Sequence, residues 1–118
     1  MTTVTIDLEN SKAQMRKGLL EYCILLIIAR GEMYASDILK ELKQDNLLVV
    51  EGTLYPLLSR LKTEELLNYF WKESKNGPPR KYYTLTEKGK DALAQLNLTW
   101  QELSHSINSL TQKHEKNN

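Results

Sequence analysis

The 118-residue sequence has little of what disulfide-linked, membrane-spanning and metal-binding proteins need. Its one cysteine, Cys23, has no disulfide partner within the chain. The longest apolar run, residues 22–29, is far shorter than the roughly 20 residues of a membrane span, and the N-terminus lacks a signal-peptide layout. His105 and His114 share no metal-ligand spacing with each other or with Cys23. We therefore expect a cytoplasmic protein with no membrane partner and no metal.

Signatures of catalysis are also missing. The sequence has no Gly-rich phosphate loop and no nucleophile motif. Cys23 lies inside the apolar run, where no charged neighbour would lower the pKa of its thiol, so a small buried hydrophobe is expected. The length suits one domain with a modest core. The sequence predicts neither an enzyme nor a cofactor.

The net charge is small, but positive charge is concentrated in one segment of the chain. The net charge is only +1. Residues 1–50, 51–70 and 91–118 each sum to −1, whereas residues 71–90 hold six cations against Glu73 and Glu87, a sum of +4. A charge run of this kind is often only a solvated hairpin, so it needs a structural context before it indicates a binding site.

The apolar periodicity predicts three helices in the first half of the chain. The first covers residues 11–30, with Gly31 as its left-handed stop, and the second covers residues 35–43. After a short apolar link over residues 47–50, a third helix begins near Gly52, where Pro56 is still close to its first turn. One row of its leucines faces the core: Leu54, Leu57, Leu58 and Leu61.

Two β-rich runs follow, residues 67–73 and 80–85, joined by residues 74–79. Adjacent strand residues point to opposite faces, so one of Tyr82 and Tyr83 packs on the core while the other stays near the surface. Helices followed by a two-stranded hairpin, or wing, are typical of a winged helix-turn-helix domain. The alternative is an ordinary edge hairpin blunted by proline and charge.

Under the first interpretation, the third helix and the wing bind double-stranded DNA. Hydroxyls and cations suit phosphate oxygens and base edges, and Arg60 could pair bidentately with a guanine. The predicted contacts on the exposed face of the third helix are Thr53, Tyr55, Pro56, Ser59, Arg60 and Lys62. Those on the wing are Lys75, Arg80 and Lys81.

The C-terminal segment predicts one long helix, with Thr86 as its N-cap and Glu87 in its first turn. Apolar residues then follow at spacings of 3, 4, 3, 4 and 3: Leu93, Leu96, Trp100, Leu103, Ile107 and Leu110. A small domain has little core to cover such a seam, so we expect a homodimer. The alternative is that the seam packs only on the first helix of its own chain.

The segment EGTLYPLLSRL (residues 51–61), followed by RKYYTLT (residues 80–86) and Gly89, resembles the PadR family of bacterial transcription regulators over residues 12–112. The short C-terminal segment is similar to the family's small branch. The resemblance implies a homodimeric winged helix, usually a repressor, that binds an inverted-repeat operator. It also implies a third helix in the major groove and DNA affinity that responds to small aromatic or drug-like effectors.

Three positions depart from the family pattern. Ala35-Ser36 stands where Gly-Tyr is usual, and Tyr34 is the candidate to replace the phosphate contact of that tyrosine. Glu65 occupies the place of a glycine after the third helix, where a left-handed non-glycine residue costs about 1 kcal/mol. Val50 stands where a capping Ser or Asn is frequent, which predicts a weaker helix start.

Trp100 is the only aromatic residue of the seam and is too wide for two closely packed helices. A gap lined by Trp100, Leu96 and Leu103, with Leu19 of the first helix nearby and also in the interface, would admit a flat aromatic effector. The alternative is that two indoles simply fill the interface.

The predicted fold class is mainly α (α+β), a winged helix-turn-helix with a long C-terminal helix for dimerisation. It divides the chain into an N-terminal tail (1–10), the DNA-binding domain (11–85), the dimerisation helix (86–112) and a frayed tail (113–118). The rival function is a winged helix that contacts only proteins, which the near-neutral net charge would suit.

Overall fold

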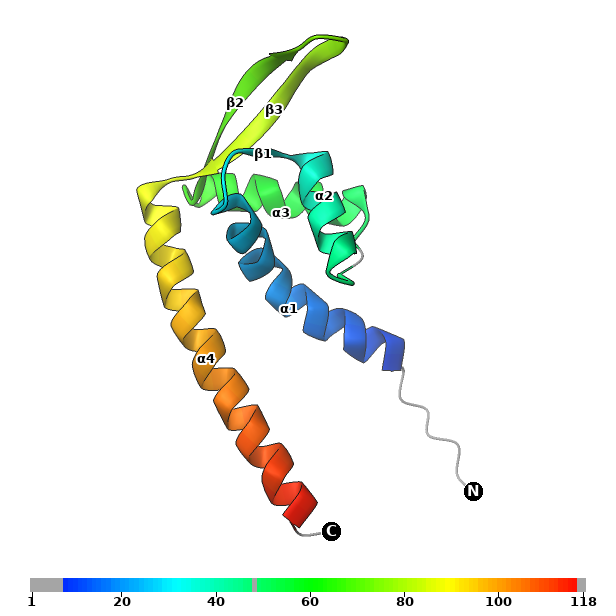
Figure 1. The fold of residues 1–118 in the computed structure, drawn as a ribbon, viewed down its shortest axis with the longest axis vertical. Coiled ribbons are helices and arrows are strands. Elements are labelled where there is room, and N and C mark those ends of the chain that lie inside the picture. Colours follow the sequence, from blue (N-terminus) through cyan, green and yellow to red (C-terminus); the bar gives the residue numbers. More distant parts are fainter. Residues whose placement is uncertain (1–7, 48, 117–118) are drawn as a thin grey trace.

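The computed structural model describes residues 8–47 and 49–116. Within these residues the chain forms four helices and a small antiparallel sheet, so the fold is mainly helical, as predicted (Figure 1). The elements follow in the order α1 (Leu8–Ile28), β1 (Met33–Tyr34), α2 (Ala35–Gln44), α3 (Glu51–Thr63), β2 (Leu67–Ser74), β3 (Gly77–Leu85) and α4 (Glu87–Lys116).

The core lies where α1, α2 and α3 meet the base of the sheet. Its most buried side chains are aliphatic and come from all of these elements: Ile24, Leu25, Ile38, Leu42, Leu54, Leu58, Leu61 and Leu67. Three of the four predicted core leucines of α3 are buried, and Leu57 is half-buried against the same cluster. The apolar row of α3 therefore anchors the helix and leaves its opposite face to solvent.

The helix bounds differ from the predicted ones mainly at the chain ends. α1 begins at Leu8 rather than Ser11, and α4 continues to Lys116 rather than Gln112. The rest of the predicted tails, residues 1–7 and 117–118, lies outside the described residues, as does Leu48 of the predicted link.

α3 starts one residue before the predicted first turn. Val50 is its N-cap and makes no side-chain capping bond, so the weaker start of the helix stays a prediction. Pro56 is consequently the sixth residue of α3 rather than part of its first four amides, and it cannot donate to the Gly52 carbonyl. Gly52 is exposed, so water can satisfy that oxygen.

α3 ends in the left-handed turn that glycine usually provides, even though the residue is Glu65. Its φ is 65°. The Glu65 N–H donates to the Lys62 carbonyl (2.9 Å) and the Leu66 N–H donates to the Leu61 carbonyl (3.0 Å), the bonding pattern of a Schellman motif. Glu65 therefore ends the helix as a glycine would, at a conformational cost of about 1 kcal/mol. Asn46 (φ 62°) ends α2 in the same way.

The sheet has the order β1-β3-β2. The two-residue β1, which was not predicted, adds Met33 opposite Tyr83 and Tyr34 opposite Tyr82. The predicted linker 74–79 is too long, because β2 reaches Ser74 and β3 already begins at Gly77. The register shifts by one residue where β3 carries Pro78 and Pro79. Prolines are tolerated there because β1 does not extend that far and a bulge needs fewer ladder bonds.

α4 leaves the sheet through a compact junction. The Gly89 N–H donates to the Thr86 hydroxyl oxygen (2.9 Å), which confirms Thr86 as the N-cap. The Thr86 hydroxyl in turn donates to the Glu65 carbonyl (2.6 Å). A Cβ at Gly89 would lie 2.1 Å from the Leu66 carbonyl oxygen, so only glycine fits this approach.

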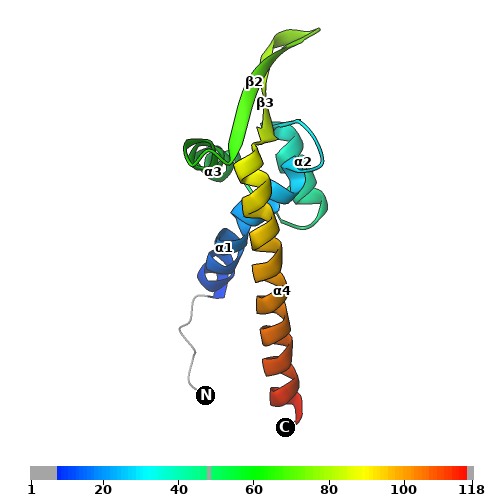
Figure 2. The same ribbon diagram turned by 90° about the vertical axis from the view of Figure 1, so that its left-hand side faces the viewer.

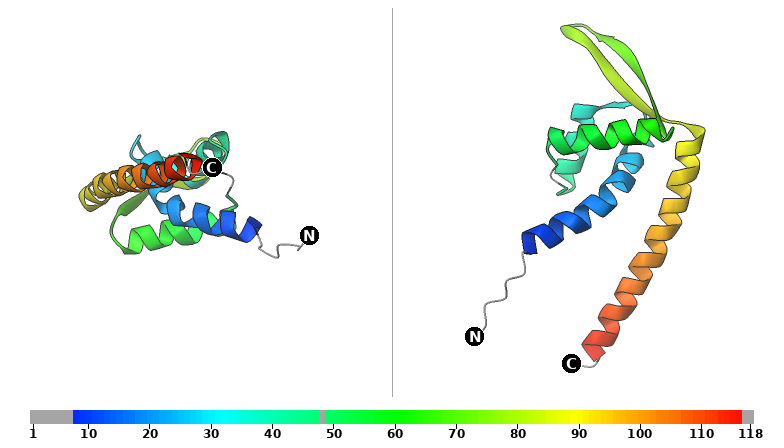
Figure 3. Two further views of the ribbon diagram at one scale, coloured as in Figure 1. Left: turned by 90° about the horizontal axis from the view of Figure 1, so that it is seen from below. Right: turned by 180° about the vertical axis from the view of Figure 1, so that it is seen from behind.

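The molecule is elongated. Its extents are 60 × 33 × 24 Å, and its radius of gyration of 17.9 Å exceeds the roughly 13–14 Å typical of a compact chain of this length. The wing and the distal part of α4 project from opposite ends of the helical core, as Figures 2 and 3 show. No helix among the described residues has the length and apolarity needed to cross a membrane.

Candidate nucleic-acid interface

The exposed face of α3 carries four of the six residues that were predicted to contact DNA from this helix. Thr53, Tyr55, Pro56 and Ser59 are all exposed, and Tyr55 keeps 49% of its surface accessible. The buried leucines on the opposite side of α3 determine this orientation. The face therefore offers hydroxyls and an aromatic ring to a partner.

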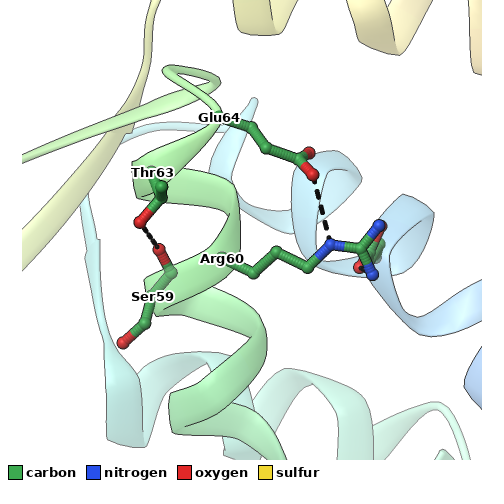
Figure 4. Close-up of polar contacts among 5 residues, drawn as sticks. Ser59, Arg60, Thr63 and Glu64 are labelled. Atoms are coloured by element: carbon green, nitrogen blue, oxygen red, sulfur yellow. Dashed lines mark hydrogen bonds and ion pairs between the residues drawn. The ribbon is translucent and has the colours of Figure 1, made fainter.

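Arg60 points elsewhere. Its guanidinium makes an ion pair with Glu21 of α1 (Nη1–Oε1, 2.8 Å) and a hydrogen bond with Glu64 (Nε–Oε1, 3.2 Å). Figure 4 shows the side chain reaching toward α1, while Ser59 leaves α3 on a different side. The hydrogen bond to Glu64 and the charges of Glu21 and Glu64 raise the pKa of Arg60. The guanidinium is therefore already occupied by two carboxylates.

Lys62 is half-buried and faces the wing. Its Nζ lies 5.6 Å from the centre of the Tyr69 ring, within cation–π range. On the same face of the hairpin, Lys81 places its Nζ 3.9 Å from the Tyr69 ring centre and 5.9 Å from that of Trp71. Tyr83 faces this side and is only 5% exposed. The prediction that Tyr82 and Tyr83 point to opposite faces of the strand is confirmed, and Tyr83 is the one that packs in the core.

The opposite face of the wing holds a second set of rings. Tyr82 packs edge-on against Tyr34 (centroids 5.3 Å apart) and stacks on Phe70 (5.9 Å). The Arg80 guanidinium carbon lies 4.7 Å from the Tyr34 ring centre. Tyr34, the N-cap residue of α2, thus supports Arg80 through its ring. Lys72 is different, because its ion pair with Glu32 (2.6 Å) raises its pKa.

An open pocket of about 400 Å³ lies at the wing base, between the start of α2, the exposed face of α3 and the strands. It brings together four of the residues predicted from sequence: Tyr34, Tyr55, Arg80 and Lys81. Ser36, Ala35, Trp71 and Tyr83 also line it. The structure does not bring Arg60 to this place, and Lys75 lies at the exposed turn of the hairpin.

Arg80 and Lys81 differ in their partners from the ion-paired cations of the molecule. Within the described part of the chain neither makes an ion pair with a carboxylate, whereas Arg30, Arg60 and Lys72 do. Rings hold the two wing cations without neutralising them. Their charge thus remains available to an anion such as a phosphate.

Sequence reasoning missed the aromatic residues of β2. Trp71 is 63% exposed and lines the pocket, and Tyr69 carries Lys81 on its ring. The alternation of residues 67–73 was the signal that could have found them, because it places both rings on the face that carries Tyr83.

The predicted α4 seam divides into a covered and an uncovered part. Leu93 is only 9% exposed and belongs to the core cluster, and Leu96 packs against that cluster. From Trp100 onward the residues are exposed: Trp100 (39%), Leu103 (50%), Ile107 (54%) and Leu110 (66%). Within its own chain, α1 therefore covers only the start of the seam.

Trp100 faces α1 across a small cavity of about 240 Å³. The other lining residues all come from α1: Leu19, Tyr22, Cys23 and Leu26. Leu19 thus lies beside Trp100 within one chain, while Leu96 and Leu103 do not line this space, and the gap between two subunits stays a prediction. The Tyr22 hydroxyl donates to Asn97 Oδ1 (2.6 Å) and ties α1 to α4 beside it. Burial raises the pKa of the Cys23 thiol, in keeping with an unreactive cysteine.

Three helices, a three-stranded sheet and a cationic wing beside an exposed helix face define a winged helix-turn-helix regulator of the DNA-binding class. The model of the PadR-like family of transcriptional regulators matches residues 24–95. The chain belongs to this family, whose members regulate transcription and are not enzymes. The resemblance in residues 51–61 and 80–86 is thereby confirmed.

Solved structures of family members agree with this assignment. A PadR-like transcription factor from Bacteroides fragilis is 56% identical, with coverage of 86% of this chain and 98% of that chain and a TM-score of 0.73. A PadR-like transcriptional regulator from Bacillus cereus is 42% identical (84% and 97% coverage, TM-score 0.75). A PadR family regulator from Eggerthella lenta is 28% identical (87% and 90% coverage, TM-score 0.79).

Proposed function

We propose that this chain is a dimeric, sequence-specific, cytoplasmic DNA-binding repressor. The observation that carries the proposal is the pair of cations at the wing base, Arg80 and Lys81, which have no carboxylate partner in the described part of the chain and adjoin the exposed face of α3. α3 would enter the major groove, and the wing would follow the phosphate backbone. Tyr34 would act by supporting Arg80.

A gel shift of the purified protein against its own upstream DNA, with random DNA of equal length as the control, tests the proposal. We expect preferential binding to the upstream DNA. Equal binding to both would favour the rival function, a winged helix that contacts proteins without specific DNA binding.

The two parts of the interface have different expected roles. Arg80→Ala or Lys81→Ala should weaken binding to all DNA sequences alike and flatten the salt dependence by about one unit of slope per lost phosphate contact. Ser59→Ala on α3 should instead change the preferred sequence. An unchanged salt slope in Arg80→Ala would mean that the wing is only a rigid hairpin, and Lys113→Ala at the far end of α4 is the charge-matched control.

The proposed dimer rests on the uncovered apolar face of α4. Trp100, Leu103, Ile107 and Leu110 follow one another at heptad spacing, and exposed Leu8, Met15 and Leu19 on α1 offer a complementary apolar surface. A two-fold dimer of winged helices would read an inverted repeat with half-sites about one helical turn, roughly 34 Å, apart. A monomeric mass by light scattering at micromolar concentration would contradict this proposal.

Release of DNA by a small aromatic or drug-like effector is the last element of the proposal. Its support is the cavity between Trp100 and α1, which a second copy of α4 would enclose further. Titration with planar cationic dyes should quench Trp100 fluorescence, with Trp100→Ala as the control and Trp71 as the remaining reporter. Identical quenching curves for the two proteins, or no binding below millimolar dye, would indicate indoles that merely fill an interface.

A further inference from the structure

Arg60 is the one arginine of α3, yet carboxylates from two elements hold it. Its side chain is 62% exposed, and its partners are Glu21 of α1 (2.8 Å) and Glu64 of α3 (3.2 Å) (Figure 4). The three groups together carry a formal charge of −1. Arg80 on the wing, by contrast, lies over the Tyr34 ring and has no carboxylate partner among the described residues.

The two carboxylates are not equivalent. Glu64 follows Arg60 by four residues on the same helix, so it accompanies Arg60 wherever α3 goes. Glu21 belongs to α1 and joins α3 to another element, and its side chain is 28% exposed. The pair with Glu21, unlike the pair with Glu64, ties the guanidinium to α1.

We propose that Glu21 determines DNA specificity by withholding Arg60 from the phosphate backbone. This inference rests on the proposed function, in which α3 reads DNA. An exposed ion pair is a weak interaction, of the same order as one phosphate contact. A bidentate contact to guanine is stronger, so only the matching base pair detaches Arg60 from Glu21. On any other sequence Arg60 stays on α1 and adds nothing to binding.

The test compares Glu21→Gln, Arg60→Ala and the double variant with the wild type. Gln is isosteric with Glu and keeps the fold, which melting temperatures should verify. Glu41→Gln is the matched control, because it removes an equal charge from the surface ion pair with Arg30 (3.1 Å), which does not involve α3. Fluorescence anisotropy with the upstream DNA and with a random duplex, over a range of salt concentrations, gives affinities and salt slopes.

Glu21→Gln should bind random DNA about threefold more tightly at low salt, with a salt slope steeper by about 0.9, because one more phosphate is contacted. Its preference for upstream over random DNA should fall. Arg60→Ala alone should leave random-DNA affinity unchanged and weaken upstream binding about tenfold. In the double variant, Glu21→Gln should have no further effect.

The inference is overturned if Glu21→Gln behaves like Glu41→Gln, or if its effect persists when Arg60 is absent. The proposed function fails separately, through equal binding of the wild type to upstream and random DNA. In that case a steeper salt slope for Glu21→Gln on random DNA would show only that Glu21 keeps Arg60 from phosphate, and the claim about specificity would fail together with the proposed function.

Discussion

The two halves of α4 carry one apolar repeat and yet differ in what covers it. Leu93 and Leu96 in the proximal half pack against the core of their own chain, whereas Trp100, Leu103, Ile107 and Leu110 in the distal half are exposed. The spacing of apolar residues indicates which face of a helix is buried. It does not indicate whether the covering surface comes from the same chain, because that depends on where the other elements end.

The largest expected effect is a loss of stability when the proximal half, which belongs to the folded core, is truncated. Leu93→Ala should reduce the free energy of unfolding by about 3 kcal/mol, since it leaves a cavity beside α1. Urea denaturation at one fixed protein concentration measures this. Leu98→Ala is the control, because Leu98 is 60% exposed on the same helix and should change stability by no more than about 0.5 kcal/mol. Similar losses for both variants would erase the distinction between the two halves.

A charged residue introduced in the distal half should weaken the proposed dimer rather than the fold of one chain. Ile107→Asp places a carboxylate in the apolar face and should weaken the proposed dimer by about 2 kcal/mol, roughly thirtyfold in dissociation constant. Sedimentation over a range of concentrations measures the effect. Asn108→Asp adds an equal charge beside the seam and should leave the mass unchanged. A dimer as tight as the wild type in Ile107→Asp would mean that another surface joins the subunits.

The contact at the boundary of the two halves should have an intermediate effect. Tyr22→Phe removes the hydrogen bond to Asn97 and should cost about 1 kcal/mol of stability, because the Asn97 oxygen loses its partner in a half-buried place. Thermal or urea unfolding detects this, with Tyr55→Phe on the exposed face of α3 as the control. No change in Tyr22→Phe would mean that packing alone joins α1 and α4 here.

The smallest effect concerns Cys23. Burial raises the pKa of its thiol, so less of the reactive thiolate is present at pH 8 than in a free cysteine, and alkylation by iodoacetamide should be slow. Trp100→Ala opens the cavity that both residues line and should accelerate alkylation about threefold. Leu110→Ala, farther along α4, should not. Equal rates in all three proteins would show that Trp100 does not shield this part of α1.

Much of the fold follows from local pattern. The leucine row of α3, the Thr86 cap and the two tyrosine faces are confirmed because each depends on neighbours in sequence. β1 could not be predicted, since two residues carry no periodicity and pair only once β3 is in place. The extent of β3 was underestimated because proline usually ends a strand, yet here β3 has no neighbour on that side.

The candidate site was harder to predict at the level of single side chains. The position of Arg80 followed from the hairpin, but its support by Tyr34 depends on β1. Arg60 was assigned to the DNA-reading face from its position on α3, and its attachment to Glu21 depends on the packing of α1 beside α3. A long side chain can reach either of two partners, and sequence spacing cannot decide between them.

The junction at Gly89 has a consequence for distance over the whole molecule. α4 is a lever arm of 30 residues, about 45 Å long, whose direction is set where Gly89 touches the Leu66 carbonyl and Thr86 binds Glu65. A tilt of 10° at that hinge would move the far end by about 8 Å, roughly a quarter of the 34 Å turn of DNA. In a dimer of the proposed kind, the absence of a side chain at Gly89 therefore helps to set the distance between the two wings.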